Sequence, residues 1–121
     1  MVERQVMVIE DTPTIQTMLV LAFGVSGFQA VVTSSAEEAL ARLPDEQPIA
    51  ILCDIQLPGM NGVEFTALLR SQSEFFRVPI VLMNGYDEPP NHDADAFVNK
   101  PFDPFEVVDK VMQCVGGRSA N

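Results

Sequence analysis

The sequence predicts an α/β fold in which a five-stranded parallel sheet lies between two layers of helices, a doubly wound three-layer sandwich. Short apolar runs alternate along the chain with stretches of helical periodicity, which indicates strand–helix–strand units. The run IAILCD at 49–54 is apolar almost throughout, as in parallel strands covered on both faces. With 121 residues, 47% of them hydrophobic, the chain fits one domain with a substantial core.

The beginning of the chain predicts a strand followed by a helix. The apolar run at 5–9 is expected to form the first strand, and Thr12 and Pro13 are typical of an N-cap and a first helical position. Apolar residues then recur at the i, i+3, i+4 and i+7 spacing of one helix face. Gly24 and Gly27 are expected to end this helix.

The next segment repeats this order. A second strand is expected at 28–33, and Ser35 with Glu38 then forms the sequence pattern of a capping box. The helix that follows is expected to stop at Pro44, because proline cannot donate a helical hydrogen bond. The apolar run at 49–54 is the third strand.

The second half of the chain predicts two strands and two helices. The turn-rich stretch LPGMNG precedes a helix at 62–72, and further strands are expected at 78–84 and 96–100. A last helix is expected to begin with capping residues and to end at two glycines: Asp103, Pro104, Glu106, Gly116 and Gly117. Its expected inner side consists of Phe105, Val108, Val111, Met112 and Val115.

The composition excludes several classes of function. The formal net charge of −10 disfavours binding to nucleic acid or to an anionic membrane surface, which both need lysine and arginine. The longest apolar run is too short to span a bilayer and no signal-peptide pattern is present, so a cytoplasmic location is expected.

Cys53 and Cys114 lie in strand and helix patterns and are expected to be small buried residues rather than a disulfide. The single histidine, His92, is expected at the surface.

Polar side chains follow four of the predicted strands at the point where each strand ends. Glu10 and Asp11 follow the first strand, Asp54 ends the third, Asn84 ends the fourth and Lys100 ends the fifth. In open parallel sheets, ligands bind outside the carboxyl ends of the strands. We therefore expect these five side chains to meet at one edge of the sheet.

This set of side chains indicates phosphoryl chemistry. Three carboxylates at one edge repel each other unless a cation lies among them, and oxygen ligands suit Mg²⁺, which commonly also takes phosphate oxygens. A lysine adds a positive charge that can contact a phosphate. A carboxylate can itself attack phosphorus and form an aspartyl phosphate. The acidic pair at positions 10 and 11 is therefore interpreted as part of a site for a divalent cation.

Together these motifs resemble the response-regulator receiver domain of two-component signalling. The resemblance rests on the acidic pair Glu10–Asp11, on Asp54 within CDIQLPGMNG, and on NKPF at 99–102, and it extends over nearly the whole chain. It implies a flavodoxin-like, CheY-like fold with a receiver domain at 1–117 and a polar tail at 118–121.

The resemblance also implies roles for individual residues. Asp54 would be the phosphoacceptor. Asp11 and Asp54 would bind Mg²⁺ through their side chains, Gln56 through its backbone carbonyl, and Glu10 through water. Lys100 would contact the phosphoryl group. The domain would not be an enzyme beyond Mg²⁺-dependent self-phosphorylation and autodephosphorylation.

The resemblance further implies a switch and its partners. Pro101 would follow a cis peptide bond, and Phe97 lies where the family has its aromatic switch residue. The phosphoryl donor would be a sensor histidine kinase or a histidine phosphotransfer protein, and the phosphorylated domain would signal to a downstream protein target. From the acidic charge of the chain, no nucleic acid or membrane partner is expected.

Two features depart from the family pattern. Asn84 stands where receivers carry threonine or serine, whose hydroxyl couples the phosphoryl group to the rest of the domain. Only 16 residues lead from Asn84 to Lys100, roughly two helical turns fewer than usual. The stretch 86–95, YDEPPNHDAD, contains two prolines and no helical apolar pattern, so the fourth helix is expected to be short or absent. An irregular, mobile loop is expected there, and the groove between the fifth strand and the last helix would be the partner surface.

Three other functions remain to be weighed. A degenerate receiver that acts as a constitutive interaction module is favoured by Asn84 and by the short interval after it, and opposed by the intact acidic residues and Lys100. A small phosphohydrolase would need a second acid two residues after Asp54, where Gln56 stands. A flavin mononucleotide binder would need a hydroxyl-rich loop after the first strand, where the acidic pair would repel the phosphate.

Overall fold

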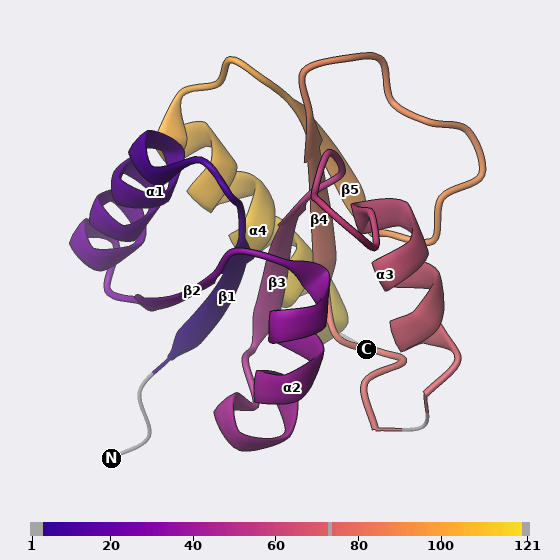
Figure 1. Cartoon of the computed structure of the whole chain (residues 1–121). Coiled ribbons are helices and arrows are strands. Elements are labelled where there is room, and N and C mark those ends of the chain that lie inside the picture. The colour runs from indigo at the N-terminus through magenta and orange to yellow at the C-terminus, as the bar shows by residue number, and fades with distance from the viewer. Residues whose placement is uncertain (1–3, 73, 120–121) are drawn as a thin grey trace.

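The five strands form one parallel sheet with helices on both faces, as the computed structural model shows for residues 4–72 and 74–119 (Figure 1). The strand order is β2-β1-β3-β4-β5, so the chain reverses its direction of winding once, beside β1. The strands are β1 Gln5–Ile9, β2 Gln29–Thr33, β3 Ala50–Asp54, β4 Ile80–Asn84 and β5 Ala96–Asn99. The predicted α/β fold class is confirmed, and the first strand has the predicted ends.

Two helices cover each face of the sheet. In Figure 1, α2 and α3 lie in front of the sheet while α1 and α4 lie behind it. The helices are α1 Pro13–Val25, α2 Ala36–Glu46, α3 Gly62–Arg70 and α4 Pro104–Ser119. None of the helices within the described ranges is long and apolar enough to cross a membrane.

Side chains alternate along each central strand between two apolar layers. Ile9 and Cys53 face the layer under α2 and α3, whereas Val8 and Leu52 face the layer under α1 and α4. Every residue of β3 and β4 is buried, which is why these strands are apolar almost throughout rather than alternating. The polar residues at the carboxyl edge of the sheet take their positions from these buried strands.

Pro44 does not stop α2, contrary to the prediction. The helix continues for two residues to Glu46 and is capped by Gln47, whose backbone is left-handed with φ 47°. The last turn keeps the buried side chain of Leu43 and an ion pair between Arg42 and Glu46, 2.7 Å apart. These contacts hold the turn although proline removes one helical hydrogen bond.

The last helix differs from its prediction at both ends. Phe105 is 50% exposed, and Val107 is buried with Val108 and Val111 instead. Gly116 does not end the helix, which runs to Ser119, so the predicted polar tail is helical at its start and its last two residues lie outside the described part. Glycine weakens a helix by only about 1 kcal/mol, and the preceding turns are packed against the sheet.

The segment 85–95 contains no helix, as predicted. It forms the long connection between β4 and β5 that arcs past α3 in Figure 1. Arg70, at the end of α3, donates from Nε to the carbonyl of Asp93 at 3.0 Å and pairs with Asp95 at 2.9 Å. The carboxylate of Asp95 also accepts a hydrogen bond from the backbone N–H of Ile80 at 2.8 Å. An irregular segment is thereby attached at its far end to α3 and β4.

His92 lies partly buried in this segment, where a surface position was predicted. Its side chain is only 10% exposed, and its Nε2 lies 2.6 Å from Glu88. The backbone N–H of Ala94 donates to the Nδ1 atom at 3.2 Å. The histidine therefore orders the segment locally.

Candidate functional site

Four of the sequence-predicted site residues meet at the carboxyl edge of the sheet. Glu10 and Asp11 directly follow β1, Asp54 is the last residue of β3, and Lys100 directly follows β5. The parallel register brings the ends of β1, β3, β4 and β5 to the same edge, although these strands are far apart in the sequence. The rule on strand ends was sufficient to predict this meeting.

Three carboxylates form a compact oxygen cluster. Glu10, Asp11 and Asp54 each offer an oxygen within 4.8 Å of the others. Glu10 and Asp54 are buried, with exposed fractions of 0% and 3%, whereas Asp11 is exposed. A set of carboxylate oxygens with one exposed side is typical of a site for a hard divalent metal ion. The residues present therefore fit such an ion.

Lys100 bridges the two buried carboxylates. Its Nζ donates to Glu10 Oε1 at 2.7 Å and to Asp54 Oδ2 at 3.1 Å. Burial alone would lower the pKa of Lys100, but its bonds to Glu10 and Asp54 outweigh this effect and raise the pKa above its usual value. The lysine is therefore a fixed positive charge in contact with both acids.

The environment of Glu10 favours its protonated form. Burial is the main cause that raises the pKa of Glu10 from 4.5 to about 7, the neighbouring carboxylate of Asp54 raises it further, and Lys100 opposes both effects. Burial also raises the pKa of the Cys53 thiol, which packs in the core. Cys53 is buried, as predicted, whereas Cys114 is only partly buried.

The backbone around the acidic pair is held by α1 and β2. The side-chain amide of Gln16 donates to the carbonyl of Glu10 at 2.5 Å, and the N–H of Glu10 donates to the carbonyl of Thr33 at 3.1 Å. The N–H of Asp11 donates to Glu10 Oε2 at 3.0 Å. The role of Gln16 could not be predicted from its sequence position, because its contact depends on how the first turn of α1 lies over the end of β1.

The β3–α3 loop, residues 55–61, follows Asp54 directly, and the residue after the loop, Gly62, packs against the backbone of Asp54. The N–H of Gln56 donates to Asp54 Oδ1 at 3.3 Å. A Cβ at Gly62, the first residue of α3, would lie 2.5 Å from the carbonyl oxygen of Asp54, so this close approach requires glycine. Asn61 and Glu64 form a complete capping box that fixes the start of α3. The pattern N-x-x-E was visible in the sequence and was overlooked there.

Asn84 lies at the site edge with an unsatisfied carbonyl. The residue is 5% exposed, and its Nδ2 lies 3.5 Å from the carbonyl of Asp87. Its Oδ1 is buried and has no hydrogen-bond partner among the described residues. The backbone carbonyl of Asn84 accepts from the N–H of Lys100 at 2.8 Å, and a cis peptide bond follows between Lys100 and Pro101, as the family resemblance implied.

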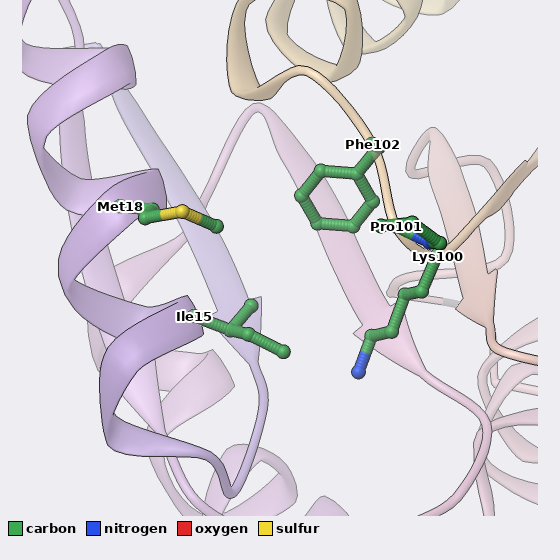
Figure 2. A pocket seen from close by; sticks show the side chains of 5 residues that line it. All are labelled: Ile15, Met18, Lys100, Pro101 and Phe102. Atoms are coloured by element: carbon green, nitrogen blue, oxygen red, sulfur yellow. The ribbon is translucent and has the colours of Figure 1, made fainter.

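An apolar pocket that the sequence did not reveal lies beside Lys100. Ile15 and Met18 of α1 face Pro101 and Phe102 of the β5–α4 connection, and Lys100 completes the lining (Figure 2). Its volume is about 290 Å³. The apolar periodicity of α1 placed Ile15 and Met18 on one helix face, but it could not show that the β5–α4 connection stands off from that face.

Known proteins with similar sequences are response regulators. The chain is 32% identical to the DNA-binding response regulator MtrA of Mycolicibacterium smegmatis, over 89% of this chain and 49% of that protein. It is 33% identical to the alkaline phosphatase synthesis transcriptional regulatory protein PhoP of Bacillus subtilis, over 86% of this chain and 45% of that protein. The chain thus spans about half the length of these relatives.

Solved structures of similar fold are receiver domains and response regulators. A putative response regulator from Chloroflexus aurantiacus is 25% identical, with a TM-score of 0.88 and coverage of 95% of this chain and 99% of that one. The receiver domain of the Pseudomonas aeruginosa sensor histidine kinase PA1611, with a magnesium ion coordinated in its active site cleft, is 21% identical, with a TM-score of 0.85 over 95% of this chain and 99% of that one. The second likeness concerns the fold alone.

A family model establishes what these likenesses have in common. The model described as the response regulator receiver domain matches residues 6–112. This range contains β1 from its second residue, the whole of β2 to β5, the acidic cluster and Lys100. The predicted family is therefore confirmed: the chain belongs to the response-regulator receiver domain family.

Proposed function

We propose that Asp54 accepts a phosphoryl group in a Mg²⁺-dependent phosphorelay. The observation that carries the proposal is the position of the Asp54 carboxylate, which lies within reach of two further carboxylates and 3.1 Å from Lys100 Nζ. Phosphoryl transfer depends mainly on positioning and on neutralising charge, and a divalent ion together with a lysine meets both needs.

The oxygen cluster supports Mg²⁺ as the bound ion. Asp11 and Asp54 would bind it through their side chains, Gln56 through its backbone carbonyl, and Glu10 through water. When bound, the ion neutralises charge on the carboxylates and on the phosphoryl oxygens. Oxygen ligands are the ones that Mg²⁺ prefers, and the Pseudomonas aeruginosa receiver of similar fold coordinates magnesium in its active site cleft.

The protein supplies the nucleophile and part of the charge for the transfer. A carboxylate oxygen of Asp54 attacks phosphorus, a new P–O bond forms, and the bond between phosphorus and the donor nitrogen breaks. The electron pair of that bond returns to the imidazole of the donor histidine. Lys100 contacts the phosphoryl oxygens, where its fixed positive charge stabilises the charge that gathers in the transition state.

The partners follow from the chemistry and from the charge of the chain. The donor would be a phosphohistidine on a sensor kinase or on a phosphotransfer protein, and the output would be contact with a downstream protein. Because the chain carries a net charge of −10, its receiver unit at 1–117 would bind no nucleic acid and no anionic membrane, and it would act in the cytoplasm. Its catalysis would be limited to its own phosphorylation and dephosphorylation.

A mass measurement tests the proposal. The wild type is incubated with acetyl phosphate and Mg²⁺, alongside Asp54→Asn and Asp45→Asn, the latter removing an exposed carboxylate at the end of α2. We expect one acid-labile phosphate on the wild type and on the Asp45 variant, and none on the Asp54 variant or in the presence of EDTA. Equal labelling of the Asp54 variant would rule out the assignment.

A further inference from the structure

We propose that Glu37, in the first turn of α2, is a positioning residue for the phosphorylation site. It holds the β3–α3 loop in the arrangement that Mg²⁺ and the phosphoryl group need beside Asp54. The inference rests on the proposed function of Asp54. It assigns a role at the site to a residue of α2, a helix that contributes no side chain to the acidic cluster of Glu10, Asp11 and Asp54.

The contact that carries the proposal joins two separate elements. Glu37 Oε2 accepts a hydrogen bond from the backbone N–H of Met60 at 2.9 Å, across 23 positions of sequence. This bond to Met60 is the main cause that lowers the pKa of Glu37, so the side chain is a carboxylate at neutral pH. A charged acceptor makes a stronger bond to a backbone N–H than a neutral one does.

Gly59 shows that the loop is shaped around this carboxylate. Its backbone is left-handed, with φ 74°, a conformation that glycine adopts without strain. A Cβ at this position would lie only 2.7 Å from Glu37 Oε2 and 3.2 Å from Oε1. Two successive residues of the loop, Gly59 and Met60, therefore fit closely against the Glu37 carboxylate.

The same loop is bonded to Asp54 near its start and closes back onto Ile55, the residue after Asp54, at its end. Near its start, the N–H of Gln56 donates to Asp54 Oδ1 at 3.3 Å, and the carbonyl of Gln56 is a proposed metal ligand. At its end, the N–H of Gly62 donates to the carbonyl of Ile55 at 3.1 Å. Glu37 holds the loop from outside at Met60, between these two bonds, so a change at Glu37 acts on the Gln56 carbonyl through the loop backbone.

Glu38, the next residue, offers a matched control. Its Oε1 accepts from the backbone N–H of Ser34 at 2.8 Å, a bond that belongs to the start of α2 itself. Glu37 and Glu38 carry the same charge in the same helical turn, but only the first of these two bonds reaches the β3–α3 loop. Replacing each in turn therefore separates the loop contact from the charge at the helix start.

The experiment compares Glu37→Ala, Glu37→Asp, Glu37→Gln and Glu38→Ala with the wild type. Calorimetry measures the Mg²⁺ affinity, NMR follows the response to beryllofluoride with Mg²⁺, and hydrogen exchange reports on the Met60 amide. If the contact matters, Glu37→Ala and the shorter Asp raise the Kd for Mg²⁺ about threefold to tenfold and speed the exchange of Met60. Gln keeps an acceptor oxygen and falls between them and the wild type, while Glu38→Ala matches the wild type.

The variants distinguish this result from a simple charge effect. If charge alone mattered, Glu37→Asp would match the wild type and Glu38→Ala would weaken Mg²⁺ binding as much as Glu37→Ala, which would overturn the proposal. Unchanged Mg²⁺ affinity in Glu37→Ala would overturn it as well. If the wild type itself bound neither Mg²⁺ nor beryllofluoride, the proposed function would fail first, and the positioning role with it. Unchanged exchange of Met60 in Glu37→Ala would contradict the loop contact independently of Mg²⁺.

Discussion

At the scale of single residues, the balance between one lysine and two buried acids decides the chemistry. Lys100 Nζ lies 2.7 Å from Glu10 and 3.1 Å from Asp54, so it neutralises part of the charge that a cation would also neutralise. Its removal should therefore affect metal binding and phosphoryl transfer in opposite directions. This opposition separates a role in the reaction from a role in stability.

The first prediction concerns Lys100→Met. We expect a Kd for Mg²⁺ that is equal to or lower than that of the wild type, because a positive charge beside the metal site is removed. Phosphorylation by acetyl phosphate should slow about 10- to 100-fold, because a donor to the transition state is lost. Lys110→Met, on the exposed side of α4, is the control and should change neither quantity. A parallel loss of Mg²⁺ affinity and rate would contradict the prediction.

The second prediction concerns Glu10 and pH. Its pKa in the folded protein is about 7, against an ordinary value of 4.5, so the folded state binds this proton more tightly than the unfolded state does. The resulting stabilisation is complete below about pH 4.5 and is lost as the pH rises through about 7. In EDTA, the free energy of unfolding of the wild type should fall by about 1–3 kcal/mol relative to Glu10→Gln between about pH 5 and pH 8.

Urea unfolding at several pH values measures this difference. Glu106→Gln, which removes an exposed acid from the first turn of α4, serves as the control and should run parallel to the wild type. A constant difference between wild type and Glu10→Gln over the whole pH range would show that Glu10 does not titrate in this window.

The third prediction concerns Asn84. Its buried Oδ1 has no partner in the described part of the chain, and leaving such a group unsatisfied costs about 1–3 kcal/mol. Asn84→Thr should therefore not destabilise the fold. The variant introduces a hydroxyl that can form a hydrogen bond to the phosphoryl group. We expect the beryllofluoride-induced NMR shifts near Phe97 to become larger, with phosphorylation of Asp54 retained. Shifts as large in the wild type as in the variant would contradict this view of Asn84.

At the scale of elements, the sequence predicted where strands end better than where helices end. The end of β1 at Ile9 and of β3 at Asp54 could be predicted because an apolar run stops at a charge. The end of α2 beyond Pro44, and the exposure of Phe105, depend on packing between elements, which a periodic pattern does not contain. The contacts of Gln16 and Glu37 could not be predicted for the same reason.

The fourth prediction concerns the irregular segment between β4 and β5. Arg70 attaches it to α3 through Asp93 and Asp95, and its Nη1 donates to the carbonyl of Val78 at 2.7 Å. Arg70→Met should speed amide exchange across 91–95 and lower the free energy of unfolding by about 1–3 kcal/mol, because the partly buried carbonyl of Val78 loses its donor and the bonds to Asp93 and Asp95 are lost with it. The control is Arg77→Met, which removes an exposed arginine that lies over the ring of Phe76. It should leave amide exchange across 91–95 unchanged.

The result for the wild type also tests the predicted mobility of this segment. The contacts with Arg70 and with Ile80 lie at 93–95 and not at 86–90, so we expect the amides of 86–90 to exchange fastest. Strong protection across 91–95 that persists in Arg70→Met would show that the segment is held by something other than Arg70.

At the scale of the whole molecule, the oxygen cluster joins residues that are far apart in the sequence and that the sheet brings together. Glu10 and Asp11 come from the end of β1 and Asp54 from the end of β3, and their mutual repulsion opposes the fold wherever all three are charged. The convergence of strand ends could be predicted from topology alone, whereas the 2.7 Å contact of Lys100 with Glu10 required the structure. A divalent ion at this edge should therefore stabilise the entire domain and not only a loop.

The fifth prediction follows from this coupling. A ligand that binds only the folded state stabilises it by about 2.7 kcal/mol at one hundred times its Kd. Urea unfolding of the wild type at neutral pH should show a gain of this size with Mg²⁺, beyond the effect of KCl at equal ionic strength. Asp11→Asn should lose most of the gain, yet be at least as stable as the wild type in EDTA, because one of three mutually repelling carboxylates is gone. The control Asp109→Asn, on the exposed side of α4, should keep the full gain. If the gain were lost in this variant, Mg²⁺ would act on the surface charge of the molecule instead of at the carboxyl edge of the sheet.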